Sequence, residues 1–186
     1  GQFIVFEGID GSGKSTASAH FVKELRSKIG EDNVVVTREI GGTEFAEAVR
    51  GFLGRKDDPL GARAKVLAVL AARCDHLEKV VYPEVKAGKV VVCDRYFYST
   101  YAYQGMLEHQ SGLLESLRQS THLGGLFAHP DHVVYMAGNP GVFFERATAR
   151  KRQDFPNYKG NIQQAYQLEG AYRERSEEHT SELQSR

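Results

Sequence analysis

The chain has 186 residues, of which 41% are hydrophobic, and its 24 basic residues balance 24 acidic ones. This length and composition suffice to bury one hydrophobic core, so we expect a single domain. The balanced charge argues against nucleic acid or an anionic membrane as the main partner, and no apolar stretch approaches the roughly 20 residues that span a bilayer. We recognise no signal peptide, and the two cysteines, Cys74 and Cys93, lie beside apolar sequence. We therefore expect reduced thiols and a cytoplasmic protein.

The first motif along the chain joins an apolar run to a glycine-rich loop. Phe3-Ile4-Val5-Phe6 predicts a buried strand, and residues 8–15 match the pattern G-x-x-x-x-G-K-[ST]. Between a strand and a helix, such a loop directs backbone N–H groups and the positive end of a helix dipole at one point, which suits a polyphosphate. In this pattern Lys14 reaches the β- and γ-phosphate oxygens, and the Ser15 hydroxyl ligates Mg²⁺. We predict an ATP site formed by Gly8, Ile9, Asp10, Gly11, Ser12, Gly13, Lys14, Ser15 and Thr16. A glycine-rich turn that binds nothing is the alternative.

Strands and helices alternate after the loop. The apolar pattern predicts helices at about 14–29, 45–53 and 62–81, strands at 34–37, 90–93 and 133–136, and a helix that starts at Pro140 with Asn139 as its cap. Gly30 ends the first helix, and Pro83 closes the third. This alternation indicates an α/β fold in which helices cover both faces of a parallel sheet. Ligands of such sheets bind at the carboxyl ends of the strands.

Asp94 and Arg95 directly follow the apolar run at 90–93. A carboxylate in this position can hold Mg²⁺, directly or through water, and the adjacent arginine can grip a second phosphate. Transfer between two phosphates needs such a cationic clamp because donor and acceptor are both anionic. The chain has no Asn-Lys-x-Asp motif of the kind that a GTPase carries. We therefore favour a kinase, with Lys14 and Arg95 as catalytic residues and Ser15 and Asp94 as metal ligands. A structural Asp–Arg pair is the alternative.

Four segments, in this order and at this spacing, resemble the thymidylate kinase family. They are Phe6-Glu7-Gly8-Ile9-Asp10-Gly11-Ser12-Gly13-Lys14-Ser15-Thr16, Thr37-Arg38-Glu39-Ile40-Gly41-Gly42-Thr43, Asp94-Arg95-Tyr96 and Ala102-Tyr103-Gln104-Gly105; Pro130-Asp131 and Arg73 fit as well. The likeness covers about residues 2–174. It implies a P-loop NTPase three-layer sandwich that uses ATP and Mg²⁺ to phosphorylate dTMP to dTDP, for dTTP synthesis. Family members are commonly homodimers.

The resemblance also implies roles for single residues in acceptor binding. Asp10 lies near the sugar 3′-hydroxyl, Arg38 and Arg95 meet the acceptor phosphate, Arg73 reaches the base edge or the phosphate, Thr100 lies by the pyrimidine, Tyr103 lies under the deoxyribose, and Gln104 belongs to the same set. Guanidinium groups offer forked donors that suit phosphate. Arg38 as a solvated loop cation, Arg73 as a salt-bridge partner and Tyr103 as core packing are the alternatives.

A cationic stretch at about 146–160 resembles the lid of the family. In members whose phosphate loop has no basic residue at its variable positions, as in this chain, the lid supplies the arginine that stabilises the transferring charge. Arg150 and Arg152 are therefore our candidate catalytic residues there, with Arg146 behind them. The alternative is a helix C-terminus whose dipole favours cations.

Three positions depart from the family pattern. Ile40 replaces a usual proline, Val69 stands where we expect the phenylalanine that stacks on thymine, and Ala72 replaces a usual aspartate. Loss of a stacking ring removes roughly 1–3 kcal/mol per base, so the base is less determined than the reaction type. Two alternative functions remain: a kinase for another pyrimidine nucleoside monophosphate, and a truncated ATP-binding module without catalysis.

The end of the chain differs from the rest. Residues 175–185 contain one large apolar residue and show neither a helical stripe nor strand alternation, and they read as the translation of a sequencing adapter. We expect a kinase domain at 1–174 and a non-native tail at 175–186, with the last strand of the sheet missing. Because Gly1 is not methionine, we also expect a clipped start. A sheet without its edge strand should be poorly stable and weakly active.

Overall fold

The computed structural model describes residues 1–55, 57, 60–119, 128–149 and 161–184. In this part of the chain, strands β1 (Gln2–Glu7), β2 (Val34–Arg38), β3 (Val90–Asp94) and β4 (His132–Tyr135) form one sheet in the order β2-β3-β1-β4. All three neighbouring pairs are parallel, as predicted. β4 begins and ends one residue earlier than predicted.

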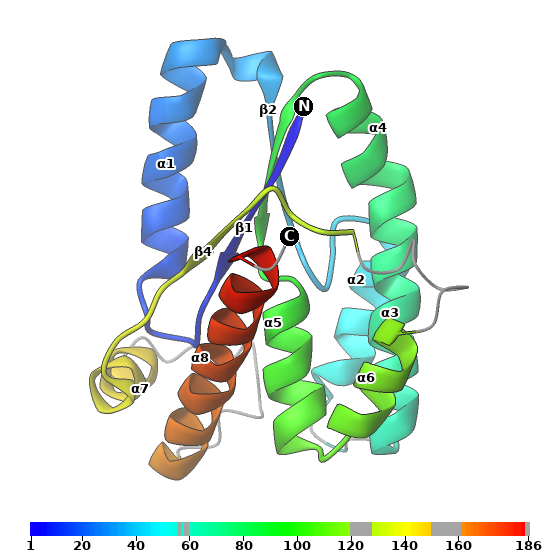
Figure 1. The fold of residues 1–186 in the computed structure, drawn as a ribbon, viewed down its shortest axis with the longest axis vertical. Helices are drawn as coiled ribbons and strands as arrows, with labels where there is room; N and C mark the ends of the chain where they lie inside the picture. Colours follow the sequence, from blue (N-terminus) through cyan, green and yellow to red (C-terminus); the bar gives the residue numbers. More distant parts are fainter. Residues whose placement is uncertain (56, 58–59, 120–127, 150–160, 185–186) are drawn as a thin grey trace.

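Helices surround the sheet, with α1 and α4 at opposite sides of the strands in Figure 1. They are α1 (Lys14–Ile29), α2 (Glu44–Leu53), α3 (Ala62–His76), α4 (Tyr82–Lys86), α5 (Phe97–Thr100), α6 (Ser111–Gln119), α7 (Pro140–Ala149) and α8 (Ile162–Gln184), with a 3₁₀ turn η1 (Glu31–Asn33) and π-helical segments η2 (Leu77–Val81) and η3 (Tyr101–Leu107).

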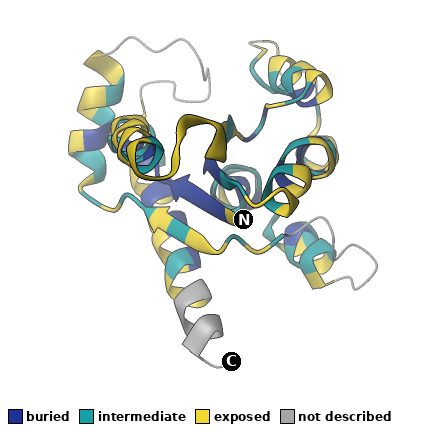
Figure 2. Ribbon diagram, turned by 90° about the horizontal axis from the view of Figure 1, so that it is seen from above, coloured by how far each residue is buried: buried dark blue, intermediate teal, exposed yellow. Residues whose placement is uncertain are grey.

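Alternation along β1 explains why both faces of the sheet are covered. Ile4 and Phe6 pack with Val22 of α1, whereas Phe3 and Val5 pack with Leu77 of η2. Successive side chains of a strand point to opposite faces, so an entirely apolar strand needs a helix layer on each side. Figure 2 shows the buried strand residues between helices whose outer faces are exposed. The predicted α/β fold is confirmed.

Pro83 does not close the third predicted helix. The helix continues through the π-helical segment η2 into α4, which ends at Lys86. Tyr82 N donates to Leu77 O, five residues back. A wider turn ahead of a proline relieves the clash between its ring and the carbonyl of the preceding turn, so the helix passes the proline.

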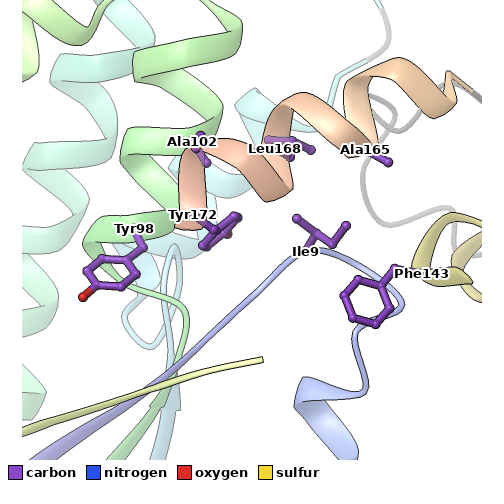
Figure 3. Close-up of a cluster of buried hydrophobic side chains, with 8 residues drawn as sticks. Ile9, Tyr98, Ala102, Phe143, Ala165, Leu168 and Tyr172 are labelled. Carbon is purple, nitrogen blue, oxygen red and sulfur yellow. The ribbon is translucent and has the colours of Figure 1, made fainter. Parts of the chain in front are cut away.

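α8 continues to Gln184, although residues 175–184 show no helical stripe. Its buried side chains Ala165, Leu168, Ala171 and Tyr172 belong to one cluster with Ile9 and Phe143. Figure 3 shows Ala165, Leu168 and Tyr172 beside Ile9 and Phe143. That packing lies before residue 175. Once a helix has formed, residues such as Glu, Leu and Gln extend it at little cost, so α8 does not need an apolar stripe over its last turns.

Two further findings concern membrane spans and the cysteines. Within the described ranges, no helix combines the length and apolarity that a membrane crossing requires. Cys74 and Cys93 are both free thiols. Burial raises the pKa of Cys93, which keeps this thiol protonated and unreactive.

Candidate active site

The phosphate loop connects β1 to α1 in the predicted strand–loop–helix order. Gly8, Gly11 and Gly13 have φ angles of 146°, 83° and 88°. Gly11 has no room for a side chain, because an added Cβ would lie 2.0 Å from the carbonyl oxygen of Phe143. No described side chain caps the N-terminus of α1, so its first backbone N–H groups are available to an anion.

Not every side chain of the loop faces a ligand. Ile9 is 1% exposed and belongs to the cluster that joins α7 and α8 (Figure 3). Our prediction that Ile9 binds ATP therefore applies to its backbone alone, because its side chain fills the core. Ser12 is buried, whereas Ser15 and Thr16 are exposed in the first turn of α1.

Lys14 forms an ion pair with Asp94 at the carboxyl end of β3. The pKa of Lys14 is lowered, first by burial and next by the positive charge of Arg95, against the opposing effect of Asp94. Asp94 is directly followed by Arg95, whose guanidinium pairs with Asp10 of the same loop. The loop lysine and the strand-end arginine therefore belong to one charged cluster, as the kinase prediction requires.

Arg95 is buried and held by three side chains. Its guanidinium donates to Asp10 Oδ1 at 2.5 Å, to Ser99 Oγ at 3.2 Å and to Tyr172 Oη at 2.8 Å. Burial alone would lower the pKa of Arg95. Tyr172, Tyr103, Asp10 and Asp94 raise this pKa by more than burial lowers it, so the side chain keeps its charge. Asp10 thus contacts the predicted acceptor arginine directly.

Glu7 supports the turn that carries Arg95. This carboxylate is fully buried, and it accepts hydrogen bonds from Tyr96 N at 2.8 Å, Ser99 N at 3.2 Å and Ser99 Oγ at 2.7 Å. Burial raises its pKa, although these bonds and Arg95 oppose the change. The Ser99 hydroxyl also lies 2.6 Å from Tyr172 Oη, so Ser99 links Glu7 to both Arg95 and Tyr172.

A cavity beside Arg95 collects most of the predicted acceptor residues. Its walls include Arg73, Arg95, Thr100, Tyr103 and Gln104. Arg73 donates from Nε to Glu39 Oε2 at 2.7 Å and from Nη2 to Thr100 Oγ1 at 2.8 Å, while its buried Nη1 has no hydrogen-bond partner among the described residues. The alternative of Arg73 as a salt-bridge partner is thus partly right, yet this cavity-lining residue keeps one donor without a partner among the described residues.

Arg38 lies outside that cavity. It borders an open groove together with Ser15 and Asp94, and its guanidinium binds both carboxylate oxygens of Glu47 at 3.0 Å. The register of the sheet pairs Arg38 with Asp94, so the predicted site residues of both strands do lie at one edge of the sheet. Because this side chain is half exposed, exchange of Glu47 for a phosphate costs little.

Ser15 and Asp94 fit a magnesium ion. They border the same groove next to the phosphate loop, and a hydroxyl and a carboxylate are the oxygen ligands that Mg²⁺ takes beside phosphate oxygens. Among the described residues, no group of three or more His, Cys, Asp or Glu forms a protein-only metal site. A metal at this edge would therefore depend on a bound nucleotide.

The lid prediction falls mostly outside the described residues. Arg150 and Arg152 belong to the range 150–160, which the structure does not describe. Arg146 is exposed in the last turn of α7, where the helix dipole favours a cation.

Three buried side chains of the site were missed by the sequence analysis. Glu7 had a signal, because a carboxylate directly follows the apolar run of β1. Tyr172 and His76 had none, since their partners are distant in sequence: Tyr172 binds Arg95, and His76 binds Thr37.

Comparisons with known proteins identify the family of the chain. A sequence model described as thymidylate kinase matches residues 6–180. The chain belongs to the thymidylate kinase family. The thymidylate kinase of Neorickettsia sennetsu is 44% identical over 140 residues, which cover 74% of this chain and 66% of the relative. That of Wolbachia pipientis subsp. Culex pipiens is 47% identical over 154 residues, which cover 82% and 72%.

A crystal structure of thymidylate kinase from Ehrlichia chaffeensis has a TM-score of 0.66 to this structure at 35% identity, and the match covers 80% of this chain and 78% of that one. The P-loop fold expected from the resemblance is thereby confirmed. The chain spans 50% and 52% of the length of two further Wolbachia thymidylate kinases that it matches. It thus covers between half and two thirds of several curated relatives, including the 66% of the Neorickettsia protein.

Two of the departures from the thymidylate kinase pattern lie in the core. Val69 and Ala72 are each 1% exposed, and neither is among the residues that border the acceptor cavity. Ile40 does border it, and the peptide bond before Ile40 is cis. A ring that stacks on the base is therefore not supplied by position 69.

Proposed function

We propose that the protein is a thymidylate kinase that transfers the γ-phosphoryl group of ATP to dTMP, with ADP and dTDP as products. The observation that carries this proposal is a pair of contacts across the phosphate loop: Lys14 pairs with Asp94, and Arg95, the next residue and part of the wall of the acceptor cavity, pairs with Asp10 of the loop. A donor phosphate on the loop and an acceptor phosphate on Arg95 would then meet head to head. Membership of the thymidylate kinase family supports the same assignment.

In the proposed reaction, the bond between the γ-phosphorus and the β–γ bridging oxygen breaks, and a bond forms from the γ-phosphorus to a phosphate oxygen of dTMP. The acceptor oxygen is already ionised, so no general base is needed. Lys14 neutralises donor charge, while Arg95 and Arg38 hold the acceptor phosphate in line. Mg²⁺, held by Ser15 and Asp94, would reduce the repulsion between the donor oxygens.

The other predicted residues have narrower roles in this proposal. Arg73 directs its remaining donor at the base or phosphate, with Thr100 and Gln104 beside it, while Tyr103 supports the deoxyribose. Asp10 orients Arg95 and meets the 3′-hydroxyl. Arg150 and Arg152 would supply lid cations to the transferring phosphoryl group.

The deciding experiment replaces Arg95. In an ATP-coupled assay with dTMP, we expect Arg95→Ala to lower kcat/KM by about 100-fold or more, because a buried charged donor to the reacting phosphate is lost. Its affinity for ATP should stay within about twofold, since Lys14 and the loop remain. Arg63→Ala, which removes an exposed cation on α3, is the matched control. An Arg95→Ala protein with unchanged turnover would refute the assignment.

The two other candidate functions are separated by the substrate panel. A kinase for another pyrimidine monophosphate would prefer dUMP, dCMP, UMP or CMP to dTMP, an outcome that the missing ring at position 69 makes worth testing. An ATP-binding module would bind ATP but phosphorylate none of these acceptors, and Arg95→Ala would leave its ATP affinity unchanged.

We also propose a cytoplasmic homodimer with small nucleotides, rather than nucleic acid or membrane, as its partners. Phe45 and Phe52 on α2 and Leu67 on α3 are exposed apolar side chains on two helices in mutual contact, which suits association. Sedimentation equilibrium tests this proposal, and a monomer at micromolar concentration would contradict it.

A further inference from the structure

His76 is a fully buried side chain that the proposed reaction does not use. It ends α3, and its ring contacts Thr37 of β2 and Glu39, a residue that borders the acceptor cavity. Its Nε2 is 2.7 Å from Thr37 Oγ1, and its Nδ1 is 3.2 Å from Glu39 Oε1. Because an ionised carboxylate only accepts, Nδ1–H donates to Glu39, and in the neutral ring Nε2 accepts from the Thr37 hydroxyl.

The two partners of His76 are the neighbours of Arg38 on either side. Neighbouring residues of an extended chain point to opposite sides, so Thr37 and Glu39 point together and Arg38 points away from them. With both neighbours bound to one imidazole, Arg38 is directed at the groove that contains Ser15 and Asp94. His76 thereby limits the rotation of the backbone that carries Arg38.

The same ring also acts on Arg73. Glu39 binds His76 through Oε1 and Arg73 Nε through Oε2, the latter at 2.7 Å. The Arg73 guanidinium then reaches Thr100 and the cavity wall. One carboxylate shared between the histidine and the arginine therefore couples the position of Arg73 to that of His76.

The turn after Glu39 leaves little space around the ring. A Cβ added to Gly42 would lie 2.7 Å from His76 Cδ2 and 2.7 Å from Thr37 Oγ1. Gly42 itself has a φ of 83°. The loop is thus packed against the imidazole as well as hydrogen-bonded to it. A ring without hydrogen-bonding groups at position 76 would fill the same space but would no longer hold Thr37 and Glu39 in place.

We propose that His76 is a positioning residue for the acceptor, which it serves by aiming Arg38 and Arg73 through Thr37 and Glu39. This inference rests on the proposed function, because it assigns both arginines to acceptor binding. It assigns no direct contact between His76 and a nucleotide.

The test compares variants of His76 in the full chain. His76→Phe keeps a buried ring and removes both hydrogen bonds, and we expect it to raise KM for dTMP about tenfold while KM for ATP stays within about twofold. His76→Gln offers one amide donor and one carbonyl acceptor, as the neutral imidazole does, and should restore a substantial part of the dTMP affinity.

Leu77→Ala is the matched control. Leu77 is the next residue, equally buried, and packs on Phe3 and Val5 rather than on the loop. We expect it to lower the melting temperature while both KM values stay unchanged within about twofold, which separates positioning from stability.

Thr37→Val provides a second route if His76→Phe fails to fold. It should raise KM for dTMP by about threefold to tenfold and leave KM for ATP unchanged. Where His76→Phe folds, Thr37→Val should add little in that background, because the bond is already lost.

The outcomes separate this inference from the proposed function. A wild-type protein that does not phosphorylate dTMP overturns both. Wild-type activity on dTMP together with an unchanged KM for dTMP in His76→Phe, or in Thr37→Val where His76→Phe does not fold, overturns the inference alone. Equal increases in KM for dTMP and KM for ATP in His76→Phe overturn the inference too. So does an increase in KM for dTMP in Leu77→Ala as large as that in His76→Phe, because a general loss of structure then explains the data.

Discussion

Individual charged side chains in this protein are arranged as a connected set. Lys14 binds Asp94, Asp10 binds Arg95, and Glu39 binds Arg73. Each of these three cations is thus held by a carboxylate before any nucleotide binds. Such pairing avoids an uncompensated buried charge and fixes the direction of each donor. The buried carboxylate of Glu7 differs from Asp10, Glu39 and Asp94, because uncharged hydrogen-bond donors hold it in place of a direct ion pair.

Glu7 yields a pH-dependent prediction. Its pKa in the folded state is raised by burial, so the protonated form is favoured there and stability falls as the pH rises from the unfolded value of 4.5 through the folded pKa. Glu7→Gln, which cannot ionise, should therefore gain stability relative to wild type as the pH increases. Melting temperatures at pH 4.5 and pH 8 measure this gain.

Glu7→Ala is the contrasting variant. It leaves three buried donors without an acceptor and should cost at least about 3 kcal/mol at any pH. A Glu7→Gln protein that loses stability relative to wild type as the pH rises would contradict the assigned direction of the pKa change.

At the scale of single elements, two close contacts between segments depend on glycine. Gly11 allows the phosphate loop to approach the backbone of α7, while Gly42 allows the loop after β2 to approach His76. At other glycines an added side chain would have open space. Gly170 in α8 is exposed, and an added Cβ would meet nothing within 4 Å. Glycine there weakens the helix without a packing reason.

We predict that Gly170→Ala stabilises the protein by about 1 kcal/mol, because alanine loses less backbone entropy in a helix interior. For a chain of this size the melting temperature should rise by about 2–4 °C. Gly88→Ala is the matched control: its added Cβ also meets nothing within 4 Å, but its φ is 87°, so it should cost about 1–2 kcal/mol. The same sign for both would show that α8 is not helical at residue 170 in solution.

At the scale of the whole molecule, the parallel sheet brings the carboxyl ends of β1, β2 and β3 to one edge. Glu7, Arg38 and Asp94 end these three strands. The phosphate loop and the acceptor cavity therefore open at neighbouring positions, although Gly8 of the loop and Glu108 of the cavity wall are 100 positions apart in the chain. α8 packs against both, through Ile9 and through Arg95.

Two nucleotides should therefore stabilise the fold separately. ATP with Mg²⁺, and dTMP, each at about 100 times its Kd, should add about 2.7 kcal/mol and raise the melting temperature by about 5–10 °C. Arg95→Ala should abolish the effect of dTMP and keep that of ATP, whereas a chelator should reduce the effect of ATP. A protein that responds to neither nucleotide would contradict the two-site arrangement.

Several features follow from the sequence alone. The phosphate loop, the α/β alternation, the start of α7 at Pro140 with Asn139 as its cap, and the Asp94-Arg95 pair are local patterns, and local sequence is enough for them because each depends on backbone preferences and on apolar periodicity. The passage of the third helix through Pro83 and the continuation of α8 past residue 174 were not predicted, because a π-helical turn and an established helix override local signals.

Only the tertiary structure decided which charged groups become partners. Arg73 is hydrogen-bonded to Glu39, Arg95 to Tyr172 and His76 to Thr37, across sequence separations of 34, 77 and 39 residues. No local pattern encodes such pairs, since they form when the register of the sheet and the packing of α3 and α8 bring distant segments together. Desolvation at these contacts then makes partner choice strict, because a buried charge without a partner is costly.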